Sequence, residues 1–477
     1  MGQKKSTWTT WILAIGVGLG LTIHLYAAIH QPFFGDEILS VFFANSYSLA
    51  QLLAHRLEPI HPNLYYLLVK ILFGLGISDL GLRLAHFGLF GLSTWLVYRF
   101  FGFWSLNHHD RLLALIFWTW SAYLLRFSYL VRMYGLAIVC LLFSLNLTFR
   151  AVASHRSLPL LVSIFIDVLG TSLVSGYWLF IAIKYSALFF LWLKHQLPPK
   201  LIKPALIGAA LSLSLLSLSR SLTPQSAANL YLYWVPIPKA GDLMGMTTVL
   251  LGLANPAYYE AITAQAPAYL ISLLALILIA VAAWLIIVKT PPLKANPLTS
   301  LLLWFCLSAL LVELSLFLTS LIFKLPYFHV RQLFPVAVCL TLGLIYLLLR
   351  LHPARPLVGR LILLCLFGLM ARKTLSYVQP DFTAYPPHFQ PVPQGLVYLT
   401  PSDIELAYDT CHARSYPEID QQCPPLNLHP LSQPVNLDQL PLATPIYLTQ
   451  SAYHLFPTPT HLTCDAIAVD FYRCLKP

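Results

Sequence analysis

Charged residues are scarce in this sequence. Only 10% of the 477 residues are Asp, Glu, Lys or Arg, whereas 58% are hydrophobic, and the mean hydropathy is +0.71. A soluble domain does not need so much apolar surface, and several apolar runs approach the length of about 20 residues that crosses a bilayer. The composition therefore excludes an ordinary soluble protein and predicts an all-α polytopic membrane protein.

Acidic residues are the scarcer charge, with 18 Asp and Glu against 29 Lys and Arg. The basic residues lie in short clusters between apolar runs, which is the positive-inside pattern of membrane proteins. We therefore expect membrane lipids, and no nucleic acid, as partners. The first run, Trp11–Ile29, is long and has no small-residue cleavage site after it, so we expect an uncleaved anchor.

The hydropathy pattern predicts about eleven membrane spans. The expected spans are Trp11–Ile29, Arg83–Phe101, Leu112–Leu125, Arg132–Phe149, Leu158–Leu173, Tyr177–Leu193, Pro204–Leu218, Pro267–Val288, Leu298–Ile322, Gln332–Leu349 and Leu361–Ser376. A cytoplasmic N-terminus puts Lys or Arg in every cytoplasmic joint: Gly102–Arg111, Arg150–Arg156, Lys194–Lys203, Lys289–Pro297 and Arg350–Arg360. The same topology places the first loop and the C-terminal segment on the extracytoplasmic side, which is the periplasm if the membrane is a bacterial inner membrane.

The segments outside the spans differ from one another in character. Ile38–Leu53 and Asn63–Phe73 have a helical period with one apolar face, so we expect amphipathic interfacial helices in the first outer loop. The sequence divides into a membrane domain, 1–376, and an extracytoplasmic domain, 377–477. The second is rich in Pro and polar residues, and its short β-like runs, Gly395–Thr400, Pro445–Thr449 and Ala466–Phe471, predict a small α/β or β-rich fold.

Four of the eight cysteines fall in that C-terminal domain. In an oxidising compartment they allow two disulfides, and we favour the nearest-neighbour pairs, Cys411 with Cys423 and Cys464 with Cys474. Free thiols are the alternative, and the lack of a Cys-x-x-Cys motif argues against zinc. The four cysteines of the spans are expected to be small core residues.

Five short segments resemble motifs of one enzyme superfamily. They are Gly35-Asp36-Glu37, His61-Pro62-Asn63-Leu64-Tyr65-Tyr66, Arg83 followed by Gly88, Gly91 and Tyr98, Arg132-Met133-Tyr134, and Val330-Arg331-Gln332-Leu333-Phe334-Pro335. Together they resemble the GT-C superfamily of polyprenyl-phosphate-sugar glycosyltransferases, which includes protein O-mannosyltransferases and the lipid A aminoarabinose transferase. The resemblance is nearer to the bacterial branch that is similar to dolichyl-phosphate-mannose-protein mannosyltransferases, and it covers about residues 11–376.

The resemblance implies a GT-C fold and a transfer of sugar from a polyprenyl-phosphate donor to a lipid, glycan or protein acceptor. It also gives the first acid of the loop pair, Asp36, the role of catalytic base, while we assign Glu37 to acceptor positioning or metal contact. Helix capping by Asp36 and a helix-dipole role for Glu37 are the alternatives. The sequence departs from the family at Leu130-Val131, where the family usually has Glu-Ala, so a second acidic residue is missing.

The leaving phosphate needs positive charge, and Arg offers a planar fork of donors. The candidate substrate-binding residues are His61, Tyr65, Arg83, Arg132, Tyr134, Lys324, His329 and Arg331. For the phosphate itself the first candidates are Arg132, Lys324, His329 and Arg331, with Arg83 and Arg126 in second rank. Snorkelling to lipid headgroups is the alternative for the arginines. His61 could instead cap a helix or bind a divalent ion with Asp36 and Glu58. Mg²⁺ or Mn²⁺ would suit such oxygen ligands, but we expect no obligatory metal because basic residues are plentiful.

Two charges, Lys184 and Glu313, lie inside apolar spans, where each needs a partner or a wet cavity. Pairing with each other is one option. Such charges would also fit a transporter or lipid flippase, although we find no internal repeat of the kind that many transporters have. A polymerase or ligase of undecaprenyl-diphosphate glycans is a third function that shares the chemistry of the first.

Overall fold

The structure is a computed structural model of the whole chain. It describes residues 7–31, 37, 40–41, 44, 48–54, 62–221, 237–239, 242–253, 277, 296–325, 328–354 and 356–378, and the backbone of five strands between 396 and 475. Asp36, His61 and the predicted span Pro267–Val288, apart from Ile277, lie outside the described residues. The chain forms two compact units, residues 1–29 with 48–379, and residues 30–47 with 380–477.

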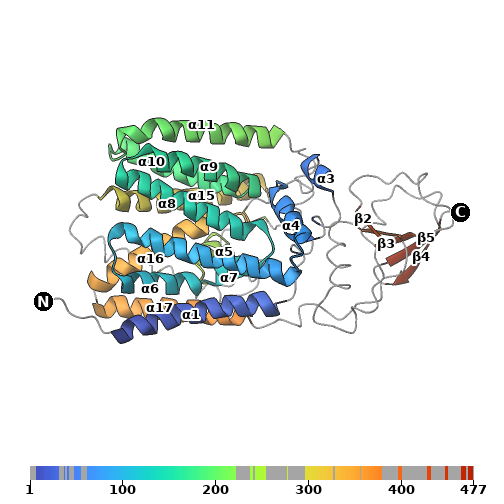
Figure 1. Ribbon diagram of the computed structural model, residues 1–477, viewed down its shortest axis with the longest axis horizontal. Coiled ribbons are helices and arrows are strands. Elements are labelled where there is room, and N and C mark those ends of the chain that lie inside the picture. Colours follow the sequence, from blue (N-terminus) through green and yellow to red (C-terminus); the bar gives the residue numbers. More distant parts are fainter. Residues whose placement is uncertain are drawn as a thin grey trace. The chain divides into compact units, whose positions relative to one another are not determined.

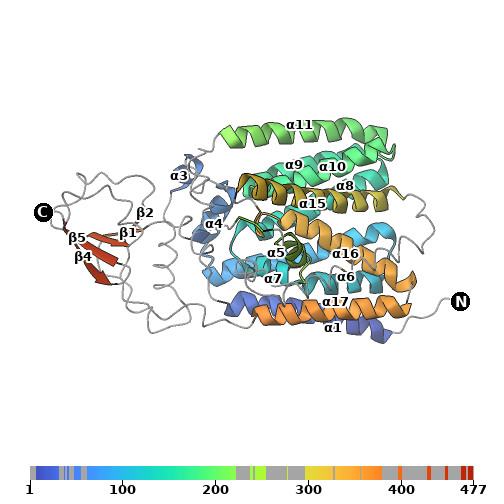
Figure 2. The same cartoon turned by 180° about the vertical axis from the view of Figure 1, so that it is seen from behind.

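The long helices of the first unit lie side by side in a bundle (Figure 1 and Figure 2). Its elements are α1 (Thr7–His30), α3 (Leu49–Ala54), α4 (Leu64–Gly74), α5 (Asp79–Phe100), the 3-10 helix η1 (Phe101–Trp104), α6 (His108–Thr119), α7 (Ala122–Tyr129), α8 (Met133–Ser154), α9 (Ser157–Leu173), α10 (Tyr177–Leu193), α11 (Pro199–Ser221), α13 (Asp242–Leu250), α15 (Pro297–Phe323), α16 (Phe334–Ala354) and α17 (Pro356–Val378).

Four of the described helices are long and apolar enough to cross a membrane. They cover Trp8–His30, Asp79–Trp104, Met133–Ser154 and Pro297–Phe323. Shorter apolar helices include Leu64–Gly74, Ser157–Leu173, Tyr177–Leu193 and Phe334–Arg350. The length and composition of these helices confirm the expectation of a helical membrane protein, whereas the number of spans and their orientation stay predictions.

Local capping explains where several helices begin. The Ser78 side chain accepts the Gly81 N–H at the start of α5, and the Asn107 side chain accepts the Asp110 N–H at the start of α6. At α15, Asn296 caps the first turn and Pro297 follows it, a position where proline's missing N–H is harmless. These caps satisfy amide groups that the first turn of a helix leaves without partners.

The second unit contains a five-stranded sheet with strand order β2-β1-β3-β5-β4. The strands are β1 (Leu396–Leu399), β2 (Asn427–Pro430), β3 (Ile446–Thr449), β4 (Thr463–Ala468) and β5 (Phe471–Leu475). β1 pairs in parallel with β2 and β3, and the pairs β3–β5 and β4–β5 are antiparallel. Of the three segments expected to be extended, Gly395–Thr400 and Pro445–Thr449 contain β1 and β3, whereas Ala466–Phe471 covers the end of β4 and the first residue of β5.

Candidate functional site

The site is built around α7, a short helix that follows a break in an apolar run. The sequence predicts one continuous span over Leu112–Leu125, but α6 ends at Thr119 and α7 starts at Ala122. That part of the expectation is wrong. The carbonyl of Thr119 accepts a hydrogen bond from His24 Nε2 at 2.8 Å, and the carbonyl of Trp120 accepts one from Thr374 Oγ1 at 2.7 Å. Side chains from α1 and α17 therefore satisfy backbone groups that the break releases.

Two glycines let the chain pack closely against this break. A Cβ on Gly20 of α1 would lie 2.5 Å from Thr119 Oγ1, and one on Gly252 would overlap the side chain of Ser121. Gly252 also has a φ of +72°, which favours glycine. Contacts with α1, α17 and Gly252 therefore hold the break in place. The break in turn sets the direction in which α7 and its buried residues point.

The first half of the site joins α7 to α4 and α5. The guanidinium carbon of Arg83, near the start of α5, lies 5.6 Å from the centroid of the Tyr129 ring on α7, which is a cation–π contact. One turn further along α5, His86 Nδ1 lies 2.9 Å from the Leu82 carbonyl and Nε2 lies 3.0 Å from the Tyr65 hydroxyl of α4. Since a carbonyl only accepts, Nδ1 donates, and a neutral ring then accepts the Tyr65 O–H.

The second half of the site joins α4 and α7 to the starts of α8 and α16. Arg132, the N-cap residue of α8, donates from Nη1 to the Tyr66 hydroxyl at 3.2 Å. The Tyr134 ring packs against Phe127 of α7 and Phe334 of α16, with centroids 5.2 and 6.1 Å apart.

The turn before α16 is tied to α7 as well. Tyr123 donates its hydroxyl hydrogen to the Val330 carbonyl at 2.8 Å. His329 Nδ1 accepts the Arg331 N–H at 3.3 Å within the same turn. These contacts place the turn that carries His329 and Arg331 beside the helix that carries Arg126.

Four buried guanidinium groups result, and we call them the arginine group: Arg83, Arg126, Arg132 and Arg331. Their exposed fractions are 2%, 4%, 4% and 9%. A guanidinium does not lose its charge in a protein, and its planar fork of N–H donors matches the oxygens of a phosphate. A snorkelling side chain would be exposed at a helix surface, so this burial favours a charged site inside the protein. The arrangement can hold an anion such as a phosphate.

Some of the other expected site residues lie in this buried region and some lie outside it. Tyr65, Tyr134 and His329 are buried in contact with this region. Lys324 caps the C-terminus of α15 with an exposed side chain, so it lies outside the buried set. Glu37 is helical and completely buried, and it belongs to the second unit. Among the described residues, no three His, Cys, Asp or Glu side chains form a group that could hold a metal ion.

Sequence reasoning missed His86 and Tyr129 and gave Arg126 second rank. His86 could have been found from its position three residues after Arg83, which puts both on one face of α5. Tyr129 and Arg126 fall in the joint between the predicted spans Leu112–Leu125 and Arg132–Phe149, and the sequence gives no sign that a separate helix, α7, carries both of them into the site.

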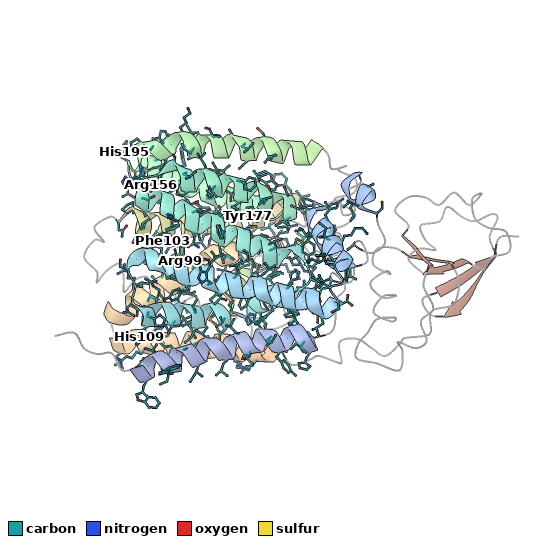
Figure 3. All side chains as sticks on the ribbon, viewed as in Figure 1. Arg99, Phe103, His109, Arg156, Tyr177 and His195 are labelled. Carbon is teal, nitrogen blue, oxygen red and sulfur yellow. The ribbon has the colours of Figure 1, made fainter. Side chains whose placement is uncertain are left out.

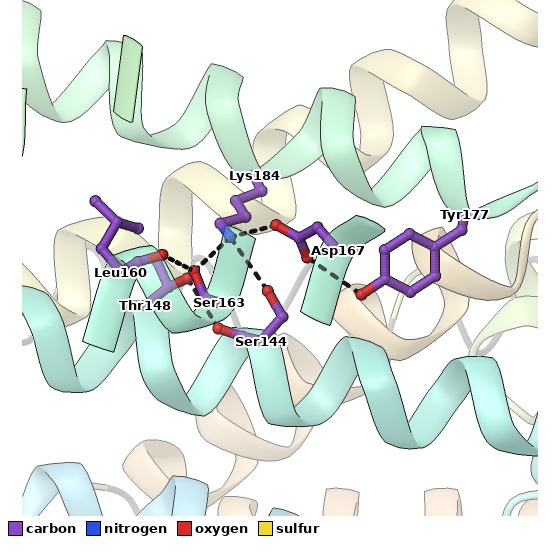
Figure 4. A network of polar contacts seen from close by, with 7 residues as sticks. All are labelled: Ser144, Thr148, Leu160, Ser163, Asp167, Tyr177 and Lys184. Carbon is purple, nitrogen blue, oxygen red and sulfur yellow. Dashed lines mark hydrogen bonds and ion pairs between the residues drawn. The ribbon is translucent and has the colours of Figure 1, made fainter. Parts of the chain in front are cut away.

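A second polar cluster, which we call the lysine network, lies within the bundle (Figure 4). Lys184 of α10 contacts Asp167 Oδ2 at 2.5 Å and the hydroxyl oxygens of Ser163 and Ser144 at 2.7 and 3.2 Å. Tyr177 donates to the other oxygen of Asp167 at 3.2 Å. The ammonium group therefore has three acceptors for its three N–H bonds, and α8, α9 and α10 all contribute. The suggested pairing of Lys184 with Glu313 is wrong, because Asp167 is the partner.

The end of the bundle opposite the arginine group carries exposed basic residues. Figure 3 labels exposed Arg99, Arg156 and His195 there, at the end of α5, just before α9 and just after α10, and half-buried His109 at the start of α6. A cleft of about 470 Å³ also lies at this end, lined by Lys194, Gln196, Ser300, Leu303, Trp304 and Leu307. None of the arginine group lines it, so we do not include it in the site.

No protein-family model and no curated protein matches this chain. The case for a function therefore depends on the residues and their geometry.

Proposed function

We propose that this chain is an integral membrane glycosyltransferase, which moves a sugar from a polyprenyl-phosphate donor to an acceptor on the extracytoplasmic face. The observation that carries the proposal is the arginine group. Four permanently charged side chains, buried with tyrosine and histidine partners at one end of an apolar bundle, suit the phosphate of a lipid-linked donor. They would stabilise the negative charge that grows on the phosphate as the sugar leaves.

The direction in which α5 and α8 run supports an extracytoplasmic position for the arginine group. Arg83 and Arg132 lie at the N-terminal ends of α5 and α8, whose C-terminal ends carry or adjoin Arg99 and Arg156 (Figure 3). A helix of about 22 residues is roughly 33 Å long, enough to cross the hydrocarbon core. We propose that the end with exposed basic residues is cytoplasmic, in accord with the positive-inside rule. The chain then has about eleven spans, as the hydropathy predicts.

In the proposed reaction Asp36 removes the proton from the acceptor, which attacks the anomeric carbon opposite the phosphate and inverts it. Arg132 and Arg331 are the first candidates for the phosphate oxygens, because Arg132 directly precedes α8 and Arg331 lies in the turn three residues before α16, at the same end of the bundle. Tyr66 orients Arg132 through its hydroxyl oxygen. A Mg²⁺ or Mn²⁺ ion is compatible with this chemistry and is not required by it.

The first test is thermal shift of the purified protein with short polyprenyl phosphates. A ligand that binds only the folded state stabilises it, by about 2.7 kcal/mol at a hundred times its Kd. We expect the phosphate lipid to raise the Tm of the wild type and of Arg99→Ala, an exposed arginine at the other end of the bundle. Arg132→Ala should lose the shift, and Arg132→Lys should keep only part of it because lysine lacks the two-pronged donor.

The same lipid without its phosphate is the control for binding of the chain alone, and it should give no comparable shift. An equal shift in Arg132→Ala and wild type would contradict the phosphate role of Arg132. No shift with any chain length would favour the second candidate, a transporter or lipid flippase, for which the buried Lys184–Asp167 pair is the supporting observation.

We also propose a disulfide between two cysteines of the second unit. In the β4–β5 pair, Cys464 lies directly opposite Cys474, and opposite residues on antiparallel strands are close enough for a disulfide when their geometry allows it. We expect this disulfide after export, with the thiol oxidants of the compartment as electron acceptors. Digestion without reductant should give a linked Cys464–Cys474 peptide that separates on reduction. Two freely alkylated thiols at these positions in exported protein would contradict it. The other pair, Cys411 with Cys423, lies outside the described residues.

A further inference from the structure

Glu313 is a carboxyl group deep inside the apolar helix α15. It lies ten residues before Phe323 and sixteen after Pro297, which corresponds to roughly 15 and 24 Å along the helix axis. Its exposed fraction is 1%. An ionised carboxylate at such a position is costly unless a cation or several donors compensate for it.

Within the part of the chain that the structure describes, the contacts of Glu313 do not supply such compensation. Its Oε1 lies 2.9 Å from the hydroxyl oxygen of Thr247 on α13. The same hydroxyl oxygen lies 2.9 Å from the Leu243 carbonyl oxygen, one turn back along α13. A threonine hydroxyl has one hydrogen to donate, and a carbonyl can only accept. If Thr247 donates to Leu243, the hydrogen between Thr247 and Glu313 must come from Glu313.

The charged and titratable groups near α15 leave this reasoning intact. α15 packs against α10, α16 and α8, and it reaches α13 through Thr247. Lys184, the cation of α10, directs its three N–H bonds to Asp167, Ser163 and Ser144. Among the described residues no cation forms an ion pair with Glu313. The charged and titratable groups on these helices are Tyr177, Lys184 and Tyr185 on α10, Cys339, Tyr346, Arg350 and His352 on α16, Tyr134, Cys140 and Arg150 on α8, Asp242 on α13, and Cys306 on α15 itself.

We propose that Glu313 is a proton-binding site within the membrane domain, occupied by a proton when α13 is packed against α15. The protonated carboxyl donates to Thr247, and Thr247 donates to Leu243, so both hydrogen bonds are made at once. Loss of the proton would leave one of these acceptors without a donor and would weaken the contact between α13 and α15. The proposal does not depend on the glycosyltransferase reaction.

Asp167 provides a matched comparison within the same protein. Both carboxyls are buried to about 1% exposure, but Asp167 has a lysine and a tyrosine hydroxyl as donors. We expect Asp167 to be ionised and Glu313 to be protonated. A reagent or a spectrum that distinguishes a carboxylic acid from a carboxylate should therefore distinguish Glu313 from Asp167.

The experiment is labelling of the full-length protein with a hydrophobic carbodiimide, followed by peptide mass spectrometry. The carboxyl O–H adds across a C=N bond of the reagent, and the product rearranges to a stable N-acylurea without any oxidant or leaving group. We expect the adduct on the Glu313 peptide, none on the Asp167 peptide, and complete loss in Glu313→Gln. The glutamine variant can still donate to Thr247, so it should fold.

If the reagent cannot reach the site, infrared difference spectroscopy tests directly whether Glu313 is protonated. The wild-type spectrum minus that of Glu313→Gln should contain the carbonyl stretch of a protonated carboxylic acid. A difference spectrum with only carboxylate bands, or labelling of Asp167 in place of Glu313, would overturn the proposal.

Discussion

Lys184→Met is expected to destabilise the folded protein by about 3–5 kcal/mol, the usual cost of removing one partner of a buried ion pair. The substitution keeps the length of an unbranched side chain but removes the ammonium group. Asp167 would then remain buried with its charge and without its lysine, and Ser144 and Ser163 would lose a donor (Figure 4). The three helices α8, α9 and α10 meet at this point, so the loss affects their mutual packing.

The measurement is the temperature at which the purified protein loses its monodisperse form in detergent. Lys194→Met, an exposed lysine just beyond the end of α10, is the matched control and should leave that temperature unchanged. The double variant Lys184→Met/Asp167→Leu removes both charges, and it should recover most of the loss because no unpaired charge remains. A double variant as unstable as Lys184→Met alone would show that packing, not charge pairing, accounts for the effect.

The lysine network shows how far sequence reasoning reaches. Hydropathy correctly indicated that Lys184 lies within an apolar helix and needs a partner. It could not identify Asp167, because periodicity assigns residues to helices but does not say which helix faces meet. Ser163 and Asp167 are four residues apart and so share one face of α9, and this was the signal in the sequence that could have suggested a polar face.

The arginine group shows a related limit. Arg83, Arg132 and Arg331 could be selected from the sequence, because each stands in a short motif at the start of a predicted span. Their grouping around α7 could not, since the apolar run of α6 and α7 continues without interruption through Thr119–Ser121. The break depends on hydrogen bonds from His24 and Thr374, which are 95 and 254 residues away from their partners. Distant contacts of this kind leave no local pattern.

Asp36→Asn is expected to lower the rate of sugar transfer by about 10²- to 10⁴-fold, the usual contribution of a general base. Asparagine has nearly the same shape as aspartate but cannot take a proton from the acceptor. It is also as good a helix N-cap as aspartate. The substitution therefore separates the two roles that the sequence allows for Asp36, because a capping role survives it and a catalytic role does not.

The measurement is the initial rate at which the purified protein consumes a panel of polyprenyl-phosphate sugars, with the thermal shift by polyprenyl phosphate recorded in parallel. Asp36→Asn should keep the wild-type Tm and the shift, since the arginine group is untouched. Asp36→Ala removes the cap as well, so any fall in its Tm below that of Asp36→Asn reports capping. Transfer at the wild-type rate in Asp36→Asn would rule out Asp36 as the base. Glu37→Gln, at the buried acid beside it, would then be the next variant, because inverting transfer still needs a group that accepts the proton.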